Sequence, residues 1–185
     1  MKIFKIVAKH NVNGDPVFRE IKVCPSDQKR LLTWNLNHSL GRKHSLDTFG
    51  DVHFQFFGFK GQEDSDFAPS GYPGGIWSAR SSDALSKCVL ASGDLHSIVV
   101  DGHRDRYRYF DCWTRIEARP NNDYIFFDDE SLKTVNFLKD QSIPDIFRSS
   151  SDRSLGLLCS ETFKSAFESN SFTGIDFIPA EVIRI

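Results

Sequence analysis

The sequence predicts an α+β fold: a single domain (residues 1–185) in which a few short helices pack on a mainly antiparallel or mixed sheet. First, apolar runs of strand length recur along the chain, and several alternate with polar residues. Second, two segments give the clearest helix signals, residues 83–91 and the stretch after Ser160, where a capping residue precedes apolar residues at helical spacing. Third, 17 phenylalanines supply a core, and a chain of 185 residues is most simply one domain.

The first half of the chain is predicted to hold strands, one short helix and two loops. The turn signal Asn13-Gly14-Asp15 lies between two strand-like segments and predicts a β-hairpin. Ser26 and Asp27 are placed to cap the helix. The loops are polar or rich in Gly, Pro and acids. In order, these elements are strands 2–9 and 16–24, helix 26–36, loop 37–50, strand 52–59 and loop 60–75.

The middle of the chain is predicted to hold a helix followed by strands. Ser82 is placed as the N-cap of that helix, and Gly93 lies just past its end. Pro144 breaks any long helix between residues 132 and 147, so this segment has no assignment. The predicted elements are helix Asp83–Ala91 and strands Leu95–Val100, Arg106–Trp113 and Tyr124–Phe127.

The C-terminal segment is predicted to form a strand, an amphipathic helix and a second short strand. Residues 155–159 are an apolar run of strand length, and Ser160 is placed to cap the following helix. Gly174 marks the exit from the helix, before an alternating strand at 175–177. Apolar residues at i, i+3 and i+4 give the helix one buried stripe: Phe163, Ala166 and Phe167.

The order of residues in this segment resembles the C-terminal signature of a family of bacterial immunity proteins, once catalogued as a domain of unknown function. The signature is Cys159-Ser160-Glu161 before the helix and Thr173-Gly174 after it. Residues 74–85 and 93–99 are similar to the middle of the same family, so the resemblance covers residues 72–178 and leaves the first 60 unassigned. These proteins neutralise polymorphic toxins delivered between competing cells. The resemblance implies a domain that binds a cognate toxin.

No motif for catalysis or for binding a metal or cofactor is evident. His103-Arg104-Asp105 matches the core of a kinase catalytic loop, but the other kinase motifs are missing, which favours a charged turn. Tyr72-Pro73-Gly74-Gly75 lacks the Gly-Lys-Ser/Thr ending of a phosphate-binding loop, which favours a chain reversal before a packed Trp77. The six histidines lack metal-ligand spacing. We therefore predict no catalytic residue, no metal and no cofactor.

Charge and hydropathy predict a soluble, cytoplasmic protein. A net charge of −2 disfavours a dedicated nucleic-acid binder. No run approaches the roughly 18 apolar residues of a membrane span, and Lys5 and Lys9 interrupt any signal-peptide core. Because the cysteines lie far apart in apolar runs, reduced thiols are the favoured interpretation over disulfides. These cysteines are Cys24, Cys88, Cys112 and Cys159.

Two acidic clusters, the second interleaved with aromatic residues, are the predicted toxin-binding residues. Aromatic side chains anchor protein interfaces, and acidic ones speed encounter with a basic partner and set specificity. Acids that enter the active site of a nucleic-acid-degrading toxin would mimic phosphate. The candidate residues are Glu63, Asp64 and Asp66 in the first cluster, and Asp123, Tyr124, Asp128, Asp129 and Glu130 in the second.

The predicted function is therefore an immunity protein that occludes the active site of one cytoplasm-acting toxin domain and is not itself an enzyme. A small enzyme is the first alternative, with His53, His96, Asp101 and Arg106 brought together from distant strands. A non-catalytic adaptor is the second alternative. A deep polar pocket lined by those four residues would favour the enzyme, whereas a flat or acidic groove would favour the inhibitor.

Overall fold

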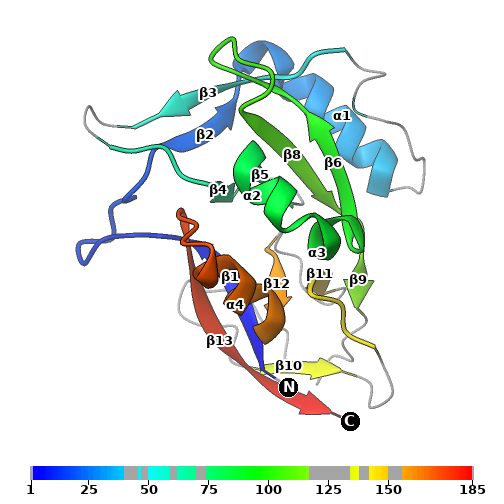
Figure 1. Cartoon of the computed structure of the whole chain (residues 1–185). Helices are drawn as coiled ribbons and strands as arrows, with labels where there is room; N and C mark the ends of the chain where they lie inside the picture. Colours follow the sequence, from blue (N-terminus) through cyan, green and yellow to red (C-terminus); the bar gives the residue numbers. More distant parts are fainter. Residues whose placement is uncertain are drawn as a thin grey trace.

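The computed structural model describes residues 2–39, 46, 50–58, 62–69, 74–116, 134–137, 142–149 and 156–184 (Figure 1). Over these residues the chain is α+β, as predicted. The helices are η1 (Pro25–Asp27, a 3-10 turn), α1 (Gln28–Ser39), α2 (Ala79–Ala84), α3 (Ser86–Leu90) and α4 (Glu161–Ser169). None of them is both long and apolar enough to cross a membrane.

The described strands form three sheets. Their orders are β10-β13-β1-β12-β11-β9, β4-β5-β8-β6 and β2-β3-β7. The strands are β1 (Ile3–Ala8), β2 (Glu20–Val23), β3 (His53–Phe57), β4 (Phe67–Pro69), β5 (Gly74–Ser78), β6 (Gly93–Ser97), β7 (Val99–Val100), β8 (Tyr107–Cys112), β9 (Arg115–Ile116), β10 (Thr134–Phe137), β11 (Ile146–Ser149), β12 (Leu158–Ser160) and β13 (Ile175–Arg184).

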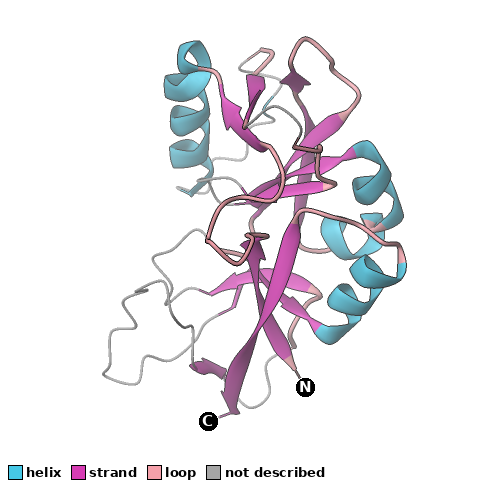
Figure 2. Cartoon of the chain, turned by 90° about the vertical axis from the view of Figure 1, so that its left-hand side faces the viewer, coloured by secondary structure: helices cyan, strands magenta, loops and turns pink. Residues whose placement is uncertain are grey.

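Helices cover the sheets from two sides. In Figure 2, α1 lies on one side, and α2, α3 and α4 lie on the other. Alternation along β5 matches this arrangement, because successive side chains of a strand face opposite sides. Ile76 belongs to the apolar cluster that contains Trp34 of α1, whereas Trp77 belongs to the cluster that contains Phe163 of α4. Both tryptophan side chains are fully buried.

The hairpin predicted for residues 2–24 is wrong beyond its turn. The backbone N–H of Val17 donates to the carbonyl of Lys9 at 3.1 Å, and His10 forms an isolated bridge with Pro16. After these contacts β1 and β2 enter different sheets. One reason is that β13 and β12 already occupy both edges of β1. A second reason is that Pro16 has no backbone N–H to extend the ladder.

The predicted N-terminal helix and the strand at 52–59 are confirmed as α1 and β3. The predicted helix 83–91 is confirmed in its second half, but the helical segment starts earlier and breaks at Leu85 into α2 and α3. Its N-cap is Ser78, which accepts a hydrogen bond from the backbone N–H of Ser81. Ser82 is instead buried and donates to the carbonyl of Ala79 at 3.0 Å.

The predicted loop 60–75 contains β4 and the start of β5, which the composition did not indicate. Gly74 and Gly75 start a buried strand because the backbone is approached too closely for a side chain. A Cβ on Gly74 would overlap the carbonyl of Phe110, and one on Gly75 would overlap the ring of Phe67. The two glycines, which suggest a loop by composition, therefore serve close packing.

The strands predicted in the middle of the chain are confirmed with changed boundaries. Residues 95–100 divide into β6 and β7, which lie in different sheets, and the strand predicted at 106–113 is β8, one residue shorter at each end. Between β7 and β8, Asp101 and Gly102 have positive φ angles of 47° and 80°. This confirms the turn predicted around His103-Arg104-Asp105, the segment that resembles a kinase loop. Within residues 132–147, β10 and the start of β11 are strands. The strand predicted at 124–127 lies outside the described residues.

The C-terminal strand–helix–strand segment is confirmed. The side chain of Ser160 caps α4 by accepting from the backbone N–H of Phe163 at 3.2 Å. Phe163 and Phe167 are buried on the inner face of α4. Gly174 has φ of 111°, which favours glycine, and it leads into β13. This last strand is longer than predicted and pairs with both β1 and β10.

Candidate functional site

Three of the eight predicted toxin-binding residues lie in the described part of the chain: Glu63, Asp64 and Asp66. Glu63 is exposed, and its carbonyl accepts a hydrogen bond from the backbone N–H of Arg19 at 3.1 Å. Asp64 forms ion pairs with Arg19 and, at 2.9 Å, with Arg106. The first acidic cluster is therefore largely neutralised by its own arginines. The other five candidates lie outside the described residues: Asp123, Tyr124, Asp128, Asp129 and Glu130.

Asp66, the third predicted toxin-binding residue of this cluster, is buried, and its carboxylate accepts five hydrogen bonds within the chain. Ser78 Oγ donates at 2.9 Å, and Arg80 donates from Nε at 3.2 Å and from Nη2 at 2.7 Å. Thr173 donates from its backbone N–H at 3.1 Å and from Oγ1 at 3.2 Å. Burial raises the pKa of Asp66, but these hydrogen bonds and the charge of Arg80 outweigh it and lower the pKa below its usual value. Asp66 therefore joins β4, α2 and the turn before β13.

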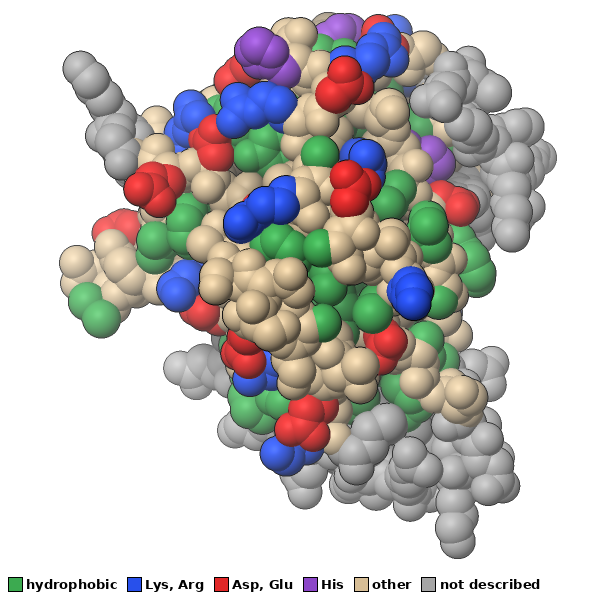
Figure 3. Space-filling view, in the orientation of Figure 1, with side chains coloured by type: hydrophobic (Ala, Val, Ile, Leu, Met, Phe, Trp, Pro, Cys, Tyr) green, Lys and Arg blue, Asp and Glu red, His purple; other side chains and the backbone are tan. Residues whose placement is uncertain are grey.

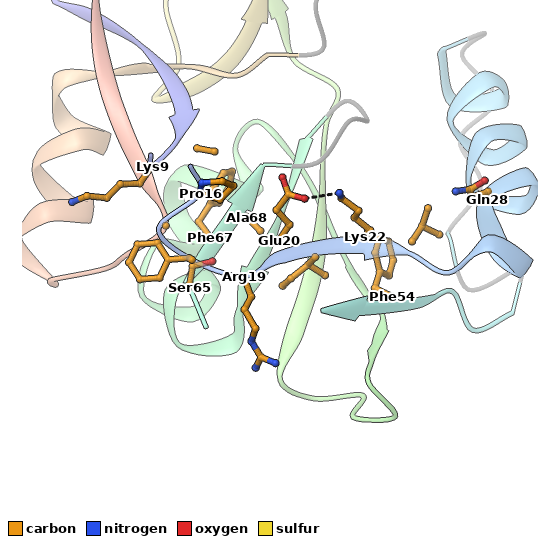
Figure 4. Close-up of a pocket in the computed structure, with 15 residues that line it drawn as sticks. Lys9, Pro16, Arg19, Glu20, Lys22, Gln28, Phe54, Ser65, Phe67 and Ala68 are labelled. Carbon is orange, nitrogen blue, oxygen red and sulfur yellow. Dashed lines mark ion pairs between the residues drawn. The ribbon is translucent and has the colours of Figure 1, made fainter. Parts of the chain in front are cut away.

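A cavity of about 310 Å³ lies where the chain leaves β1, turns and enters β2 (Figure 4). This volume is at the lower end of the range typical of ligand sites. Its apolar lining comes mainly from β2, β3 and β4, and charged side chains line it from β2 and from the end of β1. The apolar residues are Ala8, Pro16, Phe18, Ile21, Val23, Phe54, Phe67 and Ala68, and the charged ones are Lys9, Arg19, Glu20 and Lys22.

The edge of β2 that faces away from β3 lines this cavity. β2 is the end strand of its sheet. The backbone N–H of Cys24 donates to the carbonyl of His53 at 2.8 Å, so Cys24 directs its backbone groups towards β3. Because this direction alternates in an antiparallel ladder, the backbone groups of Ile21 and Val23 point the other way. In the described part of the chain no strand pairs with that edge.

Arg19 shows where this edge is covered and where it opens. Its backbone N–H also points away from β3, and the carbonyl of Glu63 accepts it. Beyond that contact the chain diverges into β4, whose Ala68 pairs with Ile76 of β5. The backbone of Ile21 and Val23 is thus left beside a cavity rather than beside another strand.

The charges around the cavity are arranged in pairs. Glu20 and Lys22 lie on one side of β2 and form an ion pair of 2.5 Å, drawn dashed in Figure 4. Lys9 lies 3.9 Å from Asp176 of β13. All four side chains are about half exposed, so each ion pair contributes little to folding stability. On the face of the molecule drawn in Figure 3, Lys and Arg are likewise mixed with Asp and Glu. Such charges remain available to pair with a partner.

The four residues of the alternative enzyme site do not form one constellation. His53 Nδ1 lies 2.8 Å from Asp27 Oδ2, whereas Arg106 is paired with Asp64. His96 is buried, with its ring centroid 5.0 Å from that of Trp34 in an edge-to-face contact. Asp101 is exposed in the turn after β7. The deep polar pocket that would favour the enzyme is therefore not formed by these four residues.

His53 and Asp27 nevertheless form the kind of pair that orients a general base, with Cys24 beside them. Asp27 also accepts a hydrogen bond from the backbone N–H of His53 at 2.8 Å, so its carboxylate holds the first residue of β3. Burial raises the pKa of the Cys24 thiol, and the carboxylates of Asp27 and Asp101 raise it further. An activated cysteine needs a lowered pKa. This group is better explained as a structural clasp between η1 and β3.

All four cysteines are free thiols, as predicted, and none lies in a metal cluster among the described residues. Burial is the main cause of their raised pKa values, which are about 11 for Cys88 and about 12 for Cys112. Cys112 and Cys159 are fully buried. These side chains therefore serve the core.

No family model matches the chain, and a search of curated proteins also finds no match. The resemblance to immunity proteins therefore remains a prediction, which rests on the sequence similarity over residues 72–178.

Reasoning from the sequence missed the cavity because its lining comes from at least five separate segments of the chain. The signal that was present lies in β2 itself. Glu20 and Lys22 alternate with Ile21 and Val23, which is typical of a strand with one solvated face. A short strand with charged residues is also typical of a sheet edge. That the edge borders a cavity depends on the path of Ser65, Phe67 and Ala68, which no local pattern indicates.

Proposed function

We propose that this protein binds and neutralises a cognate toxin domain that acts in the cytoplasm, by occluding the toxin's active site without chemistry of its own. The resemblance over residues 72–178 supplies the class of partner. The cavity beside the open edge of β2 supplies the single observation that supports protein binding most directly. An exposed edge is a template for pairing with another chain, and proteins commonly protect such edges.

In this proposal an extended segment of the toxin is added beside β2. Its backbone would bond to the outward groups of Ile21 and Val23, and its side chains would enter the apolar cavity beneath. Lys9 and Lys22 at the rim would exchange their intramolecular partners for groups on the toxin, which sets specificity more than affinity. Neutralisation requires a Kd of about 1 nM or lower, equivalent to about −12 kcal/mol.

The decisive experiment is co-expression of this chain with the product of the adjacent upstream gene. The account predicts both rescue of growth and co-purification of a stable complex. Lys9→Glu and Lys22→Glu should each weaken the complex at least about tenfold and leave folding intact, since both side chains are about half exposed. Lys87→Glu, the same charge reversal at an exposed residue of α3, is the matched control and should bind normally.

Rescue without a stable complex would contradict the proposal and favour the enzyme. His53→Ala tests that alternative, because His53 and Asp27 are the described pair most like a catalytic dyad. If enzymatic reversal of damage protects the cell, this substitution abolishes rescue although the variant still folds, because the backbone N–H of His53 continues to donate to Asp27. If binding protects the cell, rescue survives.

A further inference from the structure

The edge of β2 that borders the cavity has a defined length. At one end, the carbonyl of Glu63 accepts a hydrogen bond from the backbone N–H of Arg19 at 3.1 Å, so the edge is already covered there. At the other end, Pro25 starts η1 and has no backbone N–H to donate. A strand that is added to this edge therefore lies opposite the four residues Glu20–Val23.

Two of these four positions face the cavity. Ile21 and Val23 are buried and belong to the same apolar cluster as Phe54. Residues directly opposite each other in an antiparallel pair direct their side chains to the same face of the sheet. The side chains that an added strand places opposite Ile21 and Val23 therefore enter the cavity, whose lining includes Phe67 and Ala68 of β4. A volume of about 310 Å³ suits two aliphatic side chains better than two aromatic ones.

The other two positions carry opposite charges. Glu20 and Lys22 alternate with the buried residues, so they lie on the outer face of β2, where each is about half exposed (Figure 4). Their backbone groups point towards β3, so an added strand pairs with them without hydrogen bonds. Side chains of such pairs are the closest in an antiparallel ladder. A carboxylate opposite Lys22 and a cation opposite Glu20 are attracted, whereas the reverse arrangement places like charges opposite each other.

The direction of the added strand sets the order of its residues. Antiparallel pairing is slightly more stable per residue than parallel pairing. An antiparallel strand meets Val23 first and then Lys22, Ile21 and Glu20. Its sequence from the N-terminus to the C-terminus is therefore apolar, acidic, apolar, basic.

We propose that β2 recognises an extended segment with this pattern, in which β-branched residues such as valine occupy the two apolar positions. The proposal rests on the proposed function, because it takes the toxin as the source of the segment. The ion pair of 2.5 Å between Glu20 and Lys22 is exchanged for two ion pairs across the interface. Since both charges have a partner before and after binding, the exchange sets selectivity more than affinity.

The test is an NMR titration of the whole isotope-labelled chain with two capped peptides of identical composition. The matched peptide is Ser-Val-Asp-Val-Lys-Ser, and the charge-swapped peptide is Ser-Val-Lys-Val-Asp-Ser. The matched peptide should shift the amide signals of Ile21 and Val23 in a saturable way, and the swapped peptide should bind at least about fivefold more weakly. A matched peptide that leaves both amides unshifted at millimolar concentration would overturn the proposal. Equal affinities of the two peptides would overturn it as well.

Exchanging the two charges of β2 should reverse the order of affinities. A double variant, Glu20→Lys with Lys22→Glu, keeps the net charge and an ion pair on an exposed face, and it should prefer the swapped peptide. The matched control exchanges another exposed pair, Lys2→Glu with Glu161→Lys, and should keep the wild-type preference. A β2 double variant that still prefers the matched peptide would contradict the pattern. If that variant does not fold, the two peptides on the wild type decide alone.

Failure of this inference and failure of the proposed function give different results. A toxin complex that Lys22→Glu weakens, together with no preference between the peptides, removes the pattern and leaves the function. A preference for the matched peptide in a chain that forms no complex with the toxin removes the function and leaves the pattern.

Discussion

Replacing Asp66 with asparagine removes the charged acceptor that joins β4, α2 and the turn before β13. Three of its five hydrogen bonds reach Oδ2, from Arg80 Nη2 and from both donors of Thr173, so the amide oxygen should take that position. The new NH₂ group then faces Arg80 Nε, where two donors oppose each other. Ser78 can compensate, because its hydroxyl can turn to accept.

The expected cost follows from these contacts. Hydrogen bonds to a charged group contribute about 1.5–3 kcal/mol each, against about 1 kcal/mol for neutral ones. The side chain of Arg80 is 63% exposed, so its bonds are left out of the sum. Weakening of the two bonds from Thr173, by about 1–1.5 kcal/mol each, then sums to about 2–3 kcal/mol. Asp64→Asn, whose arginine partners are partly exposed, should cost about 1 kcal/mol or less and is the matched control.

The measurement is urea unfolding followed by tryptophan fluorescence, since Trp77 lies in the core. The difference between wild type and Asp66→Asn should also depend on pH. The pKa of Asp66 is lowered in the folded state, so its stabilising contribution is complete above the unfolded pKa of about 4 and is lost as pH falls through the folded value. The two proteins should therefore converge in acid. An Asp66→Asn protein within about 0.5 kcal/mol of the wild type at pH 7 would refute the assignment of Asp66 as a structural acceptor.

Three further substitutions or labellings test individual elements. Gly174→Ala should lower the free energy of unfolding in urea by at least about 3 kcal/mol, because the φ of Gly174 is 111° and a Cβ would overlap the carbonyl of Phe67. Gly14→Ala, with φ of 83° and open space around it, should cost only about 1 kcal/mol. Equal losses would contradict the close approach at Gly174. Ser160→Ala should lower stability by about 1 kcal/mol through loss of the cap on α4, and an unchanged unfolding midpoint would argue against that cap. Because burial raises the pKa of Cys88 to about 11, its alkylation followed by mass spectrometry should accelerate about tenfold per pH unit between pH 8 and 10, and a plateau by pH 9 would show a normal thiol.

The parts of the fold that could be predicted from the sequence are those specified by local chemistry. Ser160 followed by Phe163 and Phe167 contains both the cap and the buried face of α4, and both are found as predicted. The turn Asn13-Gly14-Asp15 is also correct as a turn. Its local signal could not show that β1 would be paired on both edges by β12 and β13, which come from the far end of the chain.

The candidate site was predictable only in part, for the same reason. A run of acids such as Glu63, Asp64 and Asp66 predicts a charged surface, but the groups that form ion pairs and hydrogen bonds with these carboxylates are distant in sequence. Arg106 lies 42 residues from Asp64, and Thr173 lies 107 residues from Asp66.

The most direct test of the central claim is amide hydrogen exchange at Ile21 and Val23, with and without the co-purified toxin. If the toxin adds a segment beside β2, the outward N–H groups of both residues become bonded, and their exchange should slow at least about tenfold in the complex. The amide of Lys22 points towards β3 and serves as the internal reference, with little change. A stable complex in which Ile21 and Val23 exchange as fast as in the free protein would contradict the account.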